Sequence, residues 1–224
     1  MISVIIPVLN EQAQVGGLLR YLTDVEGDFE TIVVDGGSMD KTIDVAREYA
    51  TVIASKRGRA VQMNTGAGRA NGDILLFLHV DCLPEKDAFS EVESIMKDFR
   101  VAGGALKYDI DDPSPLYRNH MFWSNLRARL AGIYLGDHGI FVRRTVFDKV
   151  GGFPAQPLME DVELCKKLKK EGGLVQAKSK ITSSPRRFKQ KGFTRTVLQM
   201  QANRLLYAIG VPAERLAKHY GDVR

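Results

Sequence analysis

Short apolar runs alternate with amphipathic segments along the first half of the chain. The runs are rich in Val, Ile and Leu and end in Gly, Asp or Asn, which is typical of strands buried on both faces. Strands that alternate with helices favour parallel pairing and right-handed crossovers. The pattern therefore predicts an α/β fold with a Rossmann-like, mostly parallel central sheet. Its strands are expected over residues 3–7, 29–35, 52–54, 74–78 and 102–110.

Apolar positions three or four residues apart predict the helices between these strands. The clearest example is the set Val15, Leu18, Leu19 and Leu22, which share one helical face. Beyond residue 110 the regular alternation stops, with a turn at 111–115, a strand at 140–142 and a C-terminal helical segment. Further helices are expected near 43–50, 60–70, 88–99, 116–133, 145–150, 162–168 and 194–209.

The segment 116–133 mixes aromatic and basic residues, among them Phe122, Trp123 and Arg127. Such a mixture can bind nucleic acid or a lipid-linked substrate. An aromatic stripe at helical spacing is more often part of the core. We interpret this segment as a core helix whose arginines point outward.

Length and composition indicate one cytoplasmic globular domain. The 224 residues are 44% hydrophobic and 26% charged, and the chain starts on a strand pattern without a signal peptide. No apolar run approaches the ~20 residues that span a bilayer. Cys82 and Cys165 have neither the number nor the spacing of a disulfide framework or zinc site, which fits a reducing compartment.

Positive charge is concentrated at the C-terminal end. Residues 178–224 hold 11 Lys and Arg against two acids, a net +9 within a chain of net charge +5, which leaves −4 for the rest. A basic segment suits phosphate groups, the acidic inner face of a membrane or nucleic acid. A solvated basic surface explains the same charges equally well.

Polar residues follow three of the predicted strands, as Asn10-Glu11, Asp35-Gly36-Gly37-Ser38 and His79-Val80-Asp81. Ligands of open α/β sheets bind at the carboxyl ends of the strands, so these groups indicate a nucleotide and metal site. Asp81 can hold a metal ion or a sugar hydroxyl, or it can cap the following helix. The chain has neither a phosphate-binding Gly-x-x-x-x-Gly-Lys loop nor a Gly-x-Gly-x-x-Gly fingerprint in a strand–helix context, which disfavours ATPases and dehydrogenases.

Taken together, five motifs resemble those of the inverting family 2 glycosyltransferases, which have the glycosyltransferase-A fold. They are Val-Ile-Ile-Pro-Val-Leu-Asn-Glu at 4–11, Val-Val-Asp-Gly-Gly-Ser-Met-Asp at 33–40, the segment 64–72, Gly-Gly-Phe at 151–153 and Glu-Asp at 160–161. The run 136–144 is similar to a small bacterial subgroup that includes arsenosugar-biosynthesis glycosyltransferases. The resemblance implies a catalytic domain over 1–190, with a nucleotide-binding half (1–110) and an acceptor half (111–190), and a helical extension over 191–224.

The resemblance also implies the roles of individual residues. Asp161 would be the general base, and Glu160 would orient the acceptor or support Asp161. Asp81 would bind Mn²⁺ or Mg²⁺ at the diphosphate of a nucleotide sugar, with UDP as the expected nucleotide. The chain departs from the family at His79, which replaces the first carboxylate of Asp-x-Asp. The imidazole can ligate a metal, contact the ribose or simply pack. The remaining donor-binding residues would be Pro7, Leu9, Glu11, Asp35, Arg59, Arg186 and Arg187.

Several alternatives stay open at this point. Glu160 and Asp161 also suit a helix start for purely electrostatic reasons. The helix at 194–209 can close over the site, pair with a second copy in a homodimer or rest on a membrane surface. The acceptor can be a small molecule, a glycan or a lipid-linked group, and no nucleic-acid partner is expected. The competing functions are a catalytically degenerate scaffold, suggested by His79, and a sugar nucleotidyltransferase, which lacks a glycine-rich triphosphate loop after the first strand.

Overall fold

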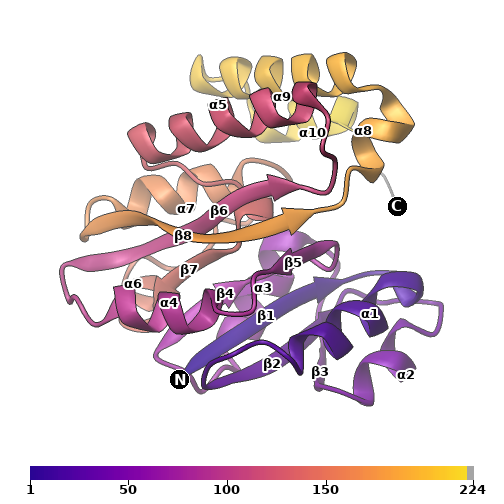
Figure 1. The fold of residues 1–224 in the computed structure, drawn as a ribbon, viewed down its shortest axis with the longest axis vertical. Coiled ribbons are helices and arrows are strands. Elements are labelled where there is room, and N and C mark those ends of the chain that lie inside the picture. The colour runs from indigo at the N-terminus through magenta and orange to yellow at the C-terminus, as the bar shows by residue number, and fades with distance from the viewer. Residues whose placement is uncertain (221–224) are drawn as a thin grey trace.

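The computed structural model describes residues 1–220, which contain one mixed eight-stranded sheet in the order β3-β2-β1-β4-β7-β6-β8-β5 (Figure 1). All six strands predicted from the sequence are present, including the short one at 140–142. Two further strands, β5 and β8, were not predicted. The strands are β1 (Ile2–Val8), β2 (Phe29–Asp35), β3 (Thr51–Ala54), β4 (Ile74–Phe77), β5 (Cys82–Pro84), β6 (Val101–Ile110), β7 (Ile140–Arg143) and β8 (Gly173–Ser183).

The parallel part of the sheet is its N-terminal half. Strands β3, β2, β1 and β4 pair in parallel, as the alternation of strands and helices predicts. In the other half, β7 runs antiparallel to both β4 and β6, and β5 runs antiparallel to β8. Only β6 and β8 pair in parallel there. The sheet is therefore more mixed than a parallel Rossmann-like sheet, because β7 enters between β4 and β6 in the opposite direction.

Helices cover both faces of the sheet and form two apolar cores. One core packs the inner faces of α1, α2 and α4 against the sheet, and the predicted stripe Val15, Leu18, Leu19 and Leu22 lies in it. The second core joins α3, α6 and α7 to the opposite face. The helices are α1 (Gln12–Leu22), α2 (Thr42–Arg47), α3 (Arg59–Ala67), α4 (Ala88–Met96), α5 (Pro115–Ala131), η1 (Gly136–His138, a 3₁₀ turn), α6 (Arg144–Lys149), α7 (Glu160–Leu168), α8 (Arg186–Lys191), α9 (Phe193–Ala208) and α10 (Ala213–Tyr220).

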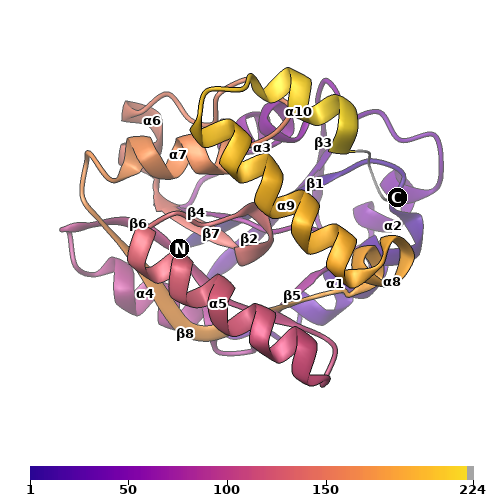
Figure 2. The ribbon, with the colours of Figure 1, turned by 90° about the horizontal axis from the view of Figure 1, so that it is seen from above.

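Helices α5, α8 and α9 form an upper tier beyond the strands β6 and β8 (Figures 1 and 2). Rings from all three helices meet in it, with Tyr117 edge-on to Phe188 and to Phe193, at 5.5 and 4.9 Å between ring centroids. No helix within residues 1–220 is long and apolar enough to cross a membrane. The last four residues of the expected extension 191–224 lie outside the described residues.

The interpretation of 116–133 as a core helix with an aromatic stripe is wrong for its largest side chains. Phe122 and Trp123 are 60% and 59% exposed. The buried side of α5 instead carries Tyr117, Ala128 and the amide of Asn125, which accepts a hydrogen bond from the Tyr108 N–H and donates one to the Tyr108 carbonyl. A helix with apolar residues on two faces does not reveal from its pattern which face is inside.

Candidate active site

A cavity of about 590 Å³ lies where the carboxyl ends of β1 and β4 meet the starts of α3 and α7 and the inner sides of α8 and α9. We call its wall of strand ends and helix starts the floor, which carries Asp81, Asp137, Glu160 and Asp161. We call its wall from α8 and α9 the roof. Nine of the ten residues predicted from the sequence line this cavity: Pro7, Leu9, Glu11, Arg59, Asp81, Glu160, Asp161, Arg186 and Arg187.

Asp35 is the predicted residue that is not part of the cavity lining. Its carboxylate is buried and accepts hydrogen bonds from the backbone N–H groups of Gly37, at 2.8 Å, and Ser38, at 3.0 Å. These bonds fix the loop after β2. The same loop is tied to the end of β1, because the Asn10 side chain accepts a hydrogen bond from the Met39 N–H at 2.9 Å. Asp35 thus holds the backbone of this loop next to the end of β1.

Asp161 lies in the first turn of α7 and both its oxygens accept backbone hydrogen bonds. Oδ2 accepts from the Gly136 N–H at 2.8 Å and Oδ1 from the Val162 N–H at 2.7 Å. Burial and then the charge of Glu160 raise the pKa of Asp161 to about 7. A carboxylate with that pKa changes protonation state near neutral pH, as a general base must.

Glu160 is nearly fully buried and pairs with Arg59 at the start of α3, with 3.5 Å between Oε1 and Nη1. The ion pair joins the start of α7 to the start of α3 across the floor. Met159, directly before the two acids, has a left-handed backbone with φ of 63°. A non-glycine residue in that region is strained, and such strain concentrates at functional sites.

His79 packs against the turn that holds Asp161. A Cβ placed on Gly136 would lie 2.8 Å from the Cε1 and Nε2 atoms of His79, so a side chain at 136 would displace the imidazole. Burial and the charge of Arg59 lower the pKa of His79 to about 4, which leaves the ring neutral at pH 7. Its buried Nε2 has no hydrogen-bond partner among the residues described.

Asp137 is a floor acid that the sequence did not single out. Burial and then the charge of Asp81 raise its pKa to about 6, and its Oδ1 is buried without a hydrogen-bond partner in the described part of the chain. The next residue, His138, is 1% exposed and its ring stacks on Tyr108 at 4.9 Å between centroids. His138 is therefore a buried core ring, while Asp137 faces the cavity.

The floor fits a divalent cation that also contacts a phosphate ligand. Within residues 1–220 no three His, Cys, Asp or Glu side chains form a ready-made metal site. Asp81, however, faces the cavity beside Asp137 Oδ1 and His79 Nε2, which are both buried without a hydrogen-bond partner in this part of the chain. Mg²⁺ and similar ions are often held by one or two carboxylates, with phosphate oxygens and water completing the shell.

The roof is basic. Arg186, Arg187 and Arg204 line it, together with Asn203 and Met200. Phe188 is 5% exposed and packs on Tyr117 and Phe193, so it mainly anchors α8 within the upper tier. Sequence reasoning missed Asn203 and Arg204, because they lie beyond the recognised motifs. The absence of any acid in the sequence of α9 was the available signal.

The family model described as glycosyl transferase family 2 matches residues 3–151. A curated relative, glycosyltransferase AglE of Haloferax volcanii, is 27% identical over 169 residues, which are 68% of this chain and 56% of AglE. The chain thus spans just over half the length of this relative.

Two solved glycosyltransferases share the fold. Mannosyltransferase PcManGT of Pyrobaculum calidifontis, in complex with GDP-Man and Mn²⁺, superposes with a TM-score of 0.71 at 19% identity, over 98% of this chain and 68% of PcManGT. S. aureus TarS 1-349, in complex with UDP-GlcNAc, gives a TM-score of 0.61 at 17% identity, over 82% of this chain and 58% of that one. The architecture described above is therefore the glycosyltransferase-A fold.

Proposed function

The chain belongs to glycosyl transferase family 2, and we propose that it transfers a sugar from a nucleotide-diphosphate donor to an acceptor hydroxyl with inversion. The observation that carries this proposal is the fixed Asp161 carboxylate in the floor, opposite a roof of arginines. The reaction needs a base for the acceptor proton and positive charge for the leaving diphosphate. The floor carries the base, and positive charge lies on both walls, as Arg59 on the floor and as the arginines of the roof.

Asp161 would act as the general base. The acceptor oxygen forms a bond to the anomeric carbon as the bond from that carbon to the diphosphate breaks, and the hydroxyl proton passes to Asp161. Attack opposite the leaving group inverts the configuration. The Gly136 and Val162 N–H groups keep the carboxylate in one orientation, and Glu160, paired with Arg59, adds the negative charge that raises its proton affinity.

The diphosphate would be held by cationic groups from both halves of the chain. Arg59 begins α3, so the positive end of that helix dipole also faces the cavity. Arg186 and Arg187 line the opposite wall and can form charge-assisted hydrogen bonds to phosphate oxygens. Together these groups stabilise the negative charge that develops on the nucleotide as it leaves.

Asp81, with Asp137 and His79 beside it, would hold Mn²⁺ or Mg²⁺. When bound, such an ion neutralises charge on the leaving diphosphate. PcManGT, a structural neighbour, is described with GDP-Man and Mn²⁺ and TarS with UDP-GlcNAc, so both nucleotides are candidates, and the sequence motifs favour UDP.

Calorimetry with UDP and GDP, each with Mn²⁺, Mg²⁺ or chelator, tests donor binding. We expect one nucleotide to bind with metal, and Asp81→Ala to weaken that binding by about tenfold or more, because a charged ligand to the cation is lost. Asp73→Ala, on an exposed acid before β4, is the matched control. Equal affinity with and without metal in both proteins would remove Asp81 from the cation site.

No nucleotide binding under any condition would favour the second candidate, a degenerate glycosyltransferase-like scaffold. The observation behind that candidate is the imidazole of His79, at the position where the family has a carboxylate. The acceptor class, the likeness of 136–144 to the arsenosugar subgroup, a homodimer and a cytoplasmic location with contact to the inner face of a membrane all stay predictions.

A further inference from the structure

Exposed apolar side chains gather on one face of the molecule. Of the thirteen large hydrophobic residues exposed within residues 1–218, eight lie on α5, on α9 or at the C-cap of α9, and the other five are scattered over the rest of the surface. We call this exposed side of the two helices the outer face. It consists of Leu116, Phe122, Trp123, Leu130, Leu198, Leu205, Leu206 and Ile209.

The spacing of these residues places them in two stripes. Leu116, Trp123 and Leu130 are seven positions apart on α5, so they share one side of that helix. On α9 and its cap, Leu198, Leu205 and Ile209 are separated by seven and four positions. Their exposed fractions, from 53% to 78%, are large for side chains of this size. Single exposed apolar residues are ordinary, but two stripes on adjacent helices indicate a binding surface.

The opposite sides of the same helices are already occupied. Tyr117 and Met121 of α5 pack with Phe193 and Val197 of α9 in the small core of the upper tier. Met200, Asn203 and Arg204 of α9 line the cavity. Figures 1 and 2 show α5 and α9 as the uppermost layer, with α9 crossing the view from above. The outer face is thus the side of this layer that nothing in the described chain covers.

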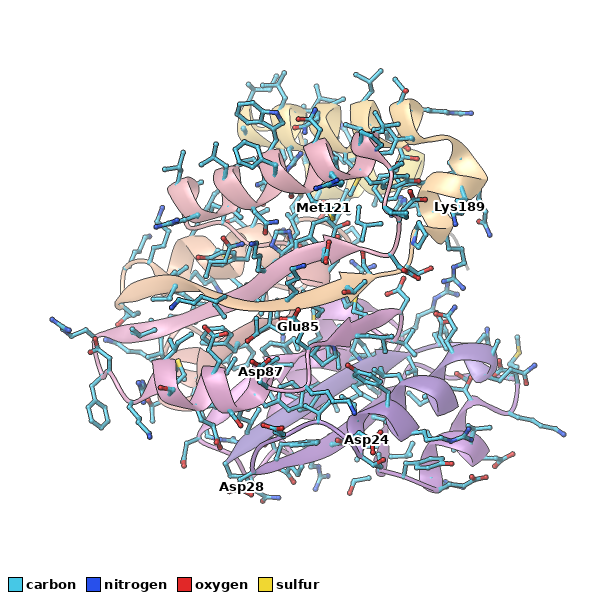
Figure 3. All side chains as sticks on the ribbon, in the orientation of Figure 1. Asp24, Asp28, Glu85, Asp87, Met121 and Lys189 are labelled. Carbon is cyan, nitrogen blue, oxygen red and sulfur yellow. The ribbon has the colours of Figure 1, made fainter. Side chains whose placement is uncertain are left out.

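The charge on the helices of the upper tier indicates which kind of partner the outer face binds. The sequences of α5, α8 and α9 contain nine Lys and Arg and no Asp or Glu. Arg118, Arg129, Lys189 and Arg195 are exposed among them. In Figure 3, Lys189 lies in the upper tier, and the labelled acids Asp24, Asp28, Glu85 and Asp87 lie in the lower part of the molecule.

We propose that the outer face docks on an anionic lipid bilayer surface. Basic residues beside Trp, Phe and Leu on helices that lie in the plane of the interface are typical of surface-bound membrane proteins. A second copy is a poor occupant, because the pairing would bring together helices that hold only positive charge. Nucleic acid would use the arginines but leave the leucine stripes in water. The proposal is independent of the glycosyl-transfer reaction.

The sole tryptophan of the chain, Trp123, reports directly on this docking. Its fluorescence is measured with vesicles of phosphatidylcholine alone or mixed with phosphatidylglycerol, without any donor, and flotation of the protein is followed in parallel. We expect a blue shift and co-flotation with the anionic vesicles only, both weakened by salt. An unchanged emission and no flotation with either vesicle would overturn the proposal.

Variants assign the binding to the outer face. Leu198→Ser combined with Leu205→Ser should reduce partition by about tenfold or more, since both side chains lose apolar contact with lipid. Lys189→Gln combined with Arg195→Gln should reduce it by about fivefold per charge. Phe99→Ser is the control, because Phe99 is 87% exposed in the turn after α4 and belongs to neither helix. A loss as large in the control would overturn the assignment.

Two further results would replace the lipid with another occupant. A blue shift that grows with protein concentration in the absence of vesicles, with a doubled mass in sedimentation, would show that a second copy covers the face. Tight binding of an RNA or DNA oligonucleotide without vesicle binding would assign the charges to nucleic acid. Circular dichroism and nucleotide titration of each variant show that the fold and the cavity are retained.

Discussion

The floor and the roof of the cavity differ in charge and in how their groups are held. The floor carries Asp81, Asp137, Glu160 and Asp161, and two of these acids are fixed by short-range partners, Asp161 by backbone N–H groups and Glu160 by Arg59. The roof carries arginines on helices without acids. On the floor, neighbouring negative charges raise the proton affinity of Asp137 and Asp161. The positive charge of the roof attracts phosphate instead. In the proposed reaction the base therefore belongs to the floor, while the roof contributes only phosphate-binding charge.

The two walls also differ in what lies behind them. Helix α7, which carries Asp161, is packed against the sheet through Leu164 and Leu168. Helix α9, which carries Arg204, has its outer side exposed along Leu198 and Leu205. The floor is therefore supported by the main core, while the roof is a layer with a face of its own. Changes on the two walls should have separable effects.

The largest effect is expected at the floor. Asp161→Asn keeps the shape of the side chain but cannot accept the acceptor proton, so transfer should fall by about 10²–10⁴-fold while nucleotide affinity is retained. Steady-state rates and calorimetry measure the two quantities. Asp148→Asn, at an exposed acid of α6, is the matched control and should leave the rate unchanged. Undiminished turnover of the Asp161 variant would remove this residue from the mechanism.

The pH dependence sharpens the same test. With a pKa of about 7, Asp161 loses its base function as pH falls, so the wild-type rate should decline below pH 7. The raised pKa also means that the folded state binds this proton more tightly than the unfolded state, so stability is lost as pH rises through about 7. Because the unfolded carboxyl has its usual pKa of 3.8, this loss develops between about pH 4 and pH 7. Thermal unfolding should therefore show the stability of Asp161→Asn, relative to wild type, rising from pH 5 to pH 8.

One apolar substitution behind each wall tests how strongly packing behind that wall stabilises the fold. Leu164→Ala opens a cavity beneath the floor and should lower the free energy of unfolding by about 2–5 kcal/mol. Leu205→Ala, on the 66% exposed side chain of the roof, should change it by no more than about 0.5 kcal/mol. Urea unfolding of both variants gives the difference. A comparable loss in the two would mean that the outer face is covered in solution.

The smallest expected effect on binding or catalysis is at the roof. Arg186→Gln removes one charge-assisted contact to the diphosphate, so the Kd for nucleotide should rise by about tenfold with little change in kcat. Arg69→Gln, an exposed arginine after α3, is the control. If kcat fell as far as it does in Asp161→Asn, the division between a chemical floor and a binding roof would fail.

The strands and helices of the N-terminal half could be predicted because the apolar residues of each element lie in one simple pattern. Residues 4–8, 32–34 and 74–77 are buried apolar runs, and α1 has one apolar side, so the sequence pattern and the burial agree. In contrast, β8 mixes Lys, Gln and Ser with Val and Ile along its length, since only part of it is buried. Strand β5 has three residues, too few to show any period.

The direction of β7 was beyond sequence reasoning. A run such as Ile-Phe-Val is the same pattern whether the strand is parallel or antiparallel, and only the path of α5 and the turn around Gly136 decide how it enters the sheet. Strand ends and recognised motifs mark Asp81, Glu160 and Asp161, and the structure brings these three residues together in one cavity. Asp137 was missed since its importance arises from proximity to Asp81, which no spacing along the chain reveals.

The position of β7 between β4 and β6 affects the order in which the sheet can form during synthesis. The strands β1 to β4 are complete once residue 77 has been synthesised, but β4 gains its second neighbour only with residues 140–143, and β5 gains its partner only with 173–183. Domains form from the N-terminus as the chain leaves the ribosome. Strand β4 therefore keeps one open edge while residues 78–139 are made, and the cavity is complete only when α8 and α9 have emerged.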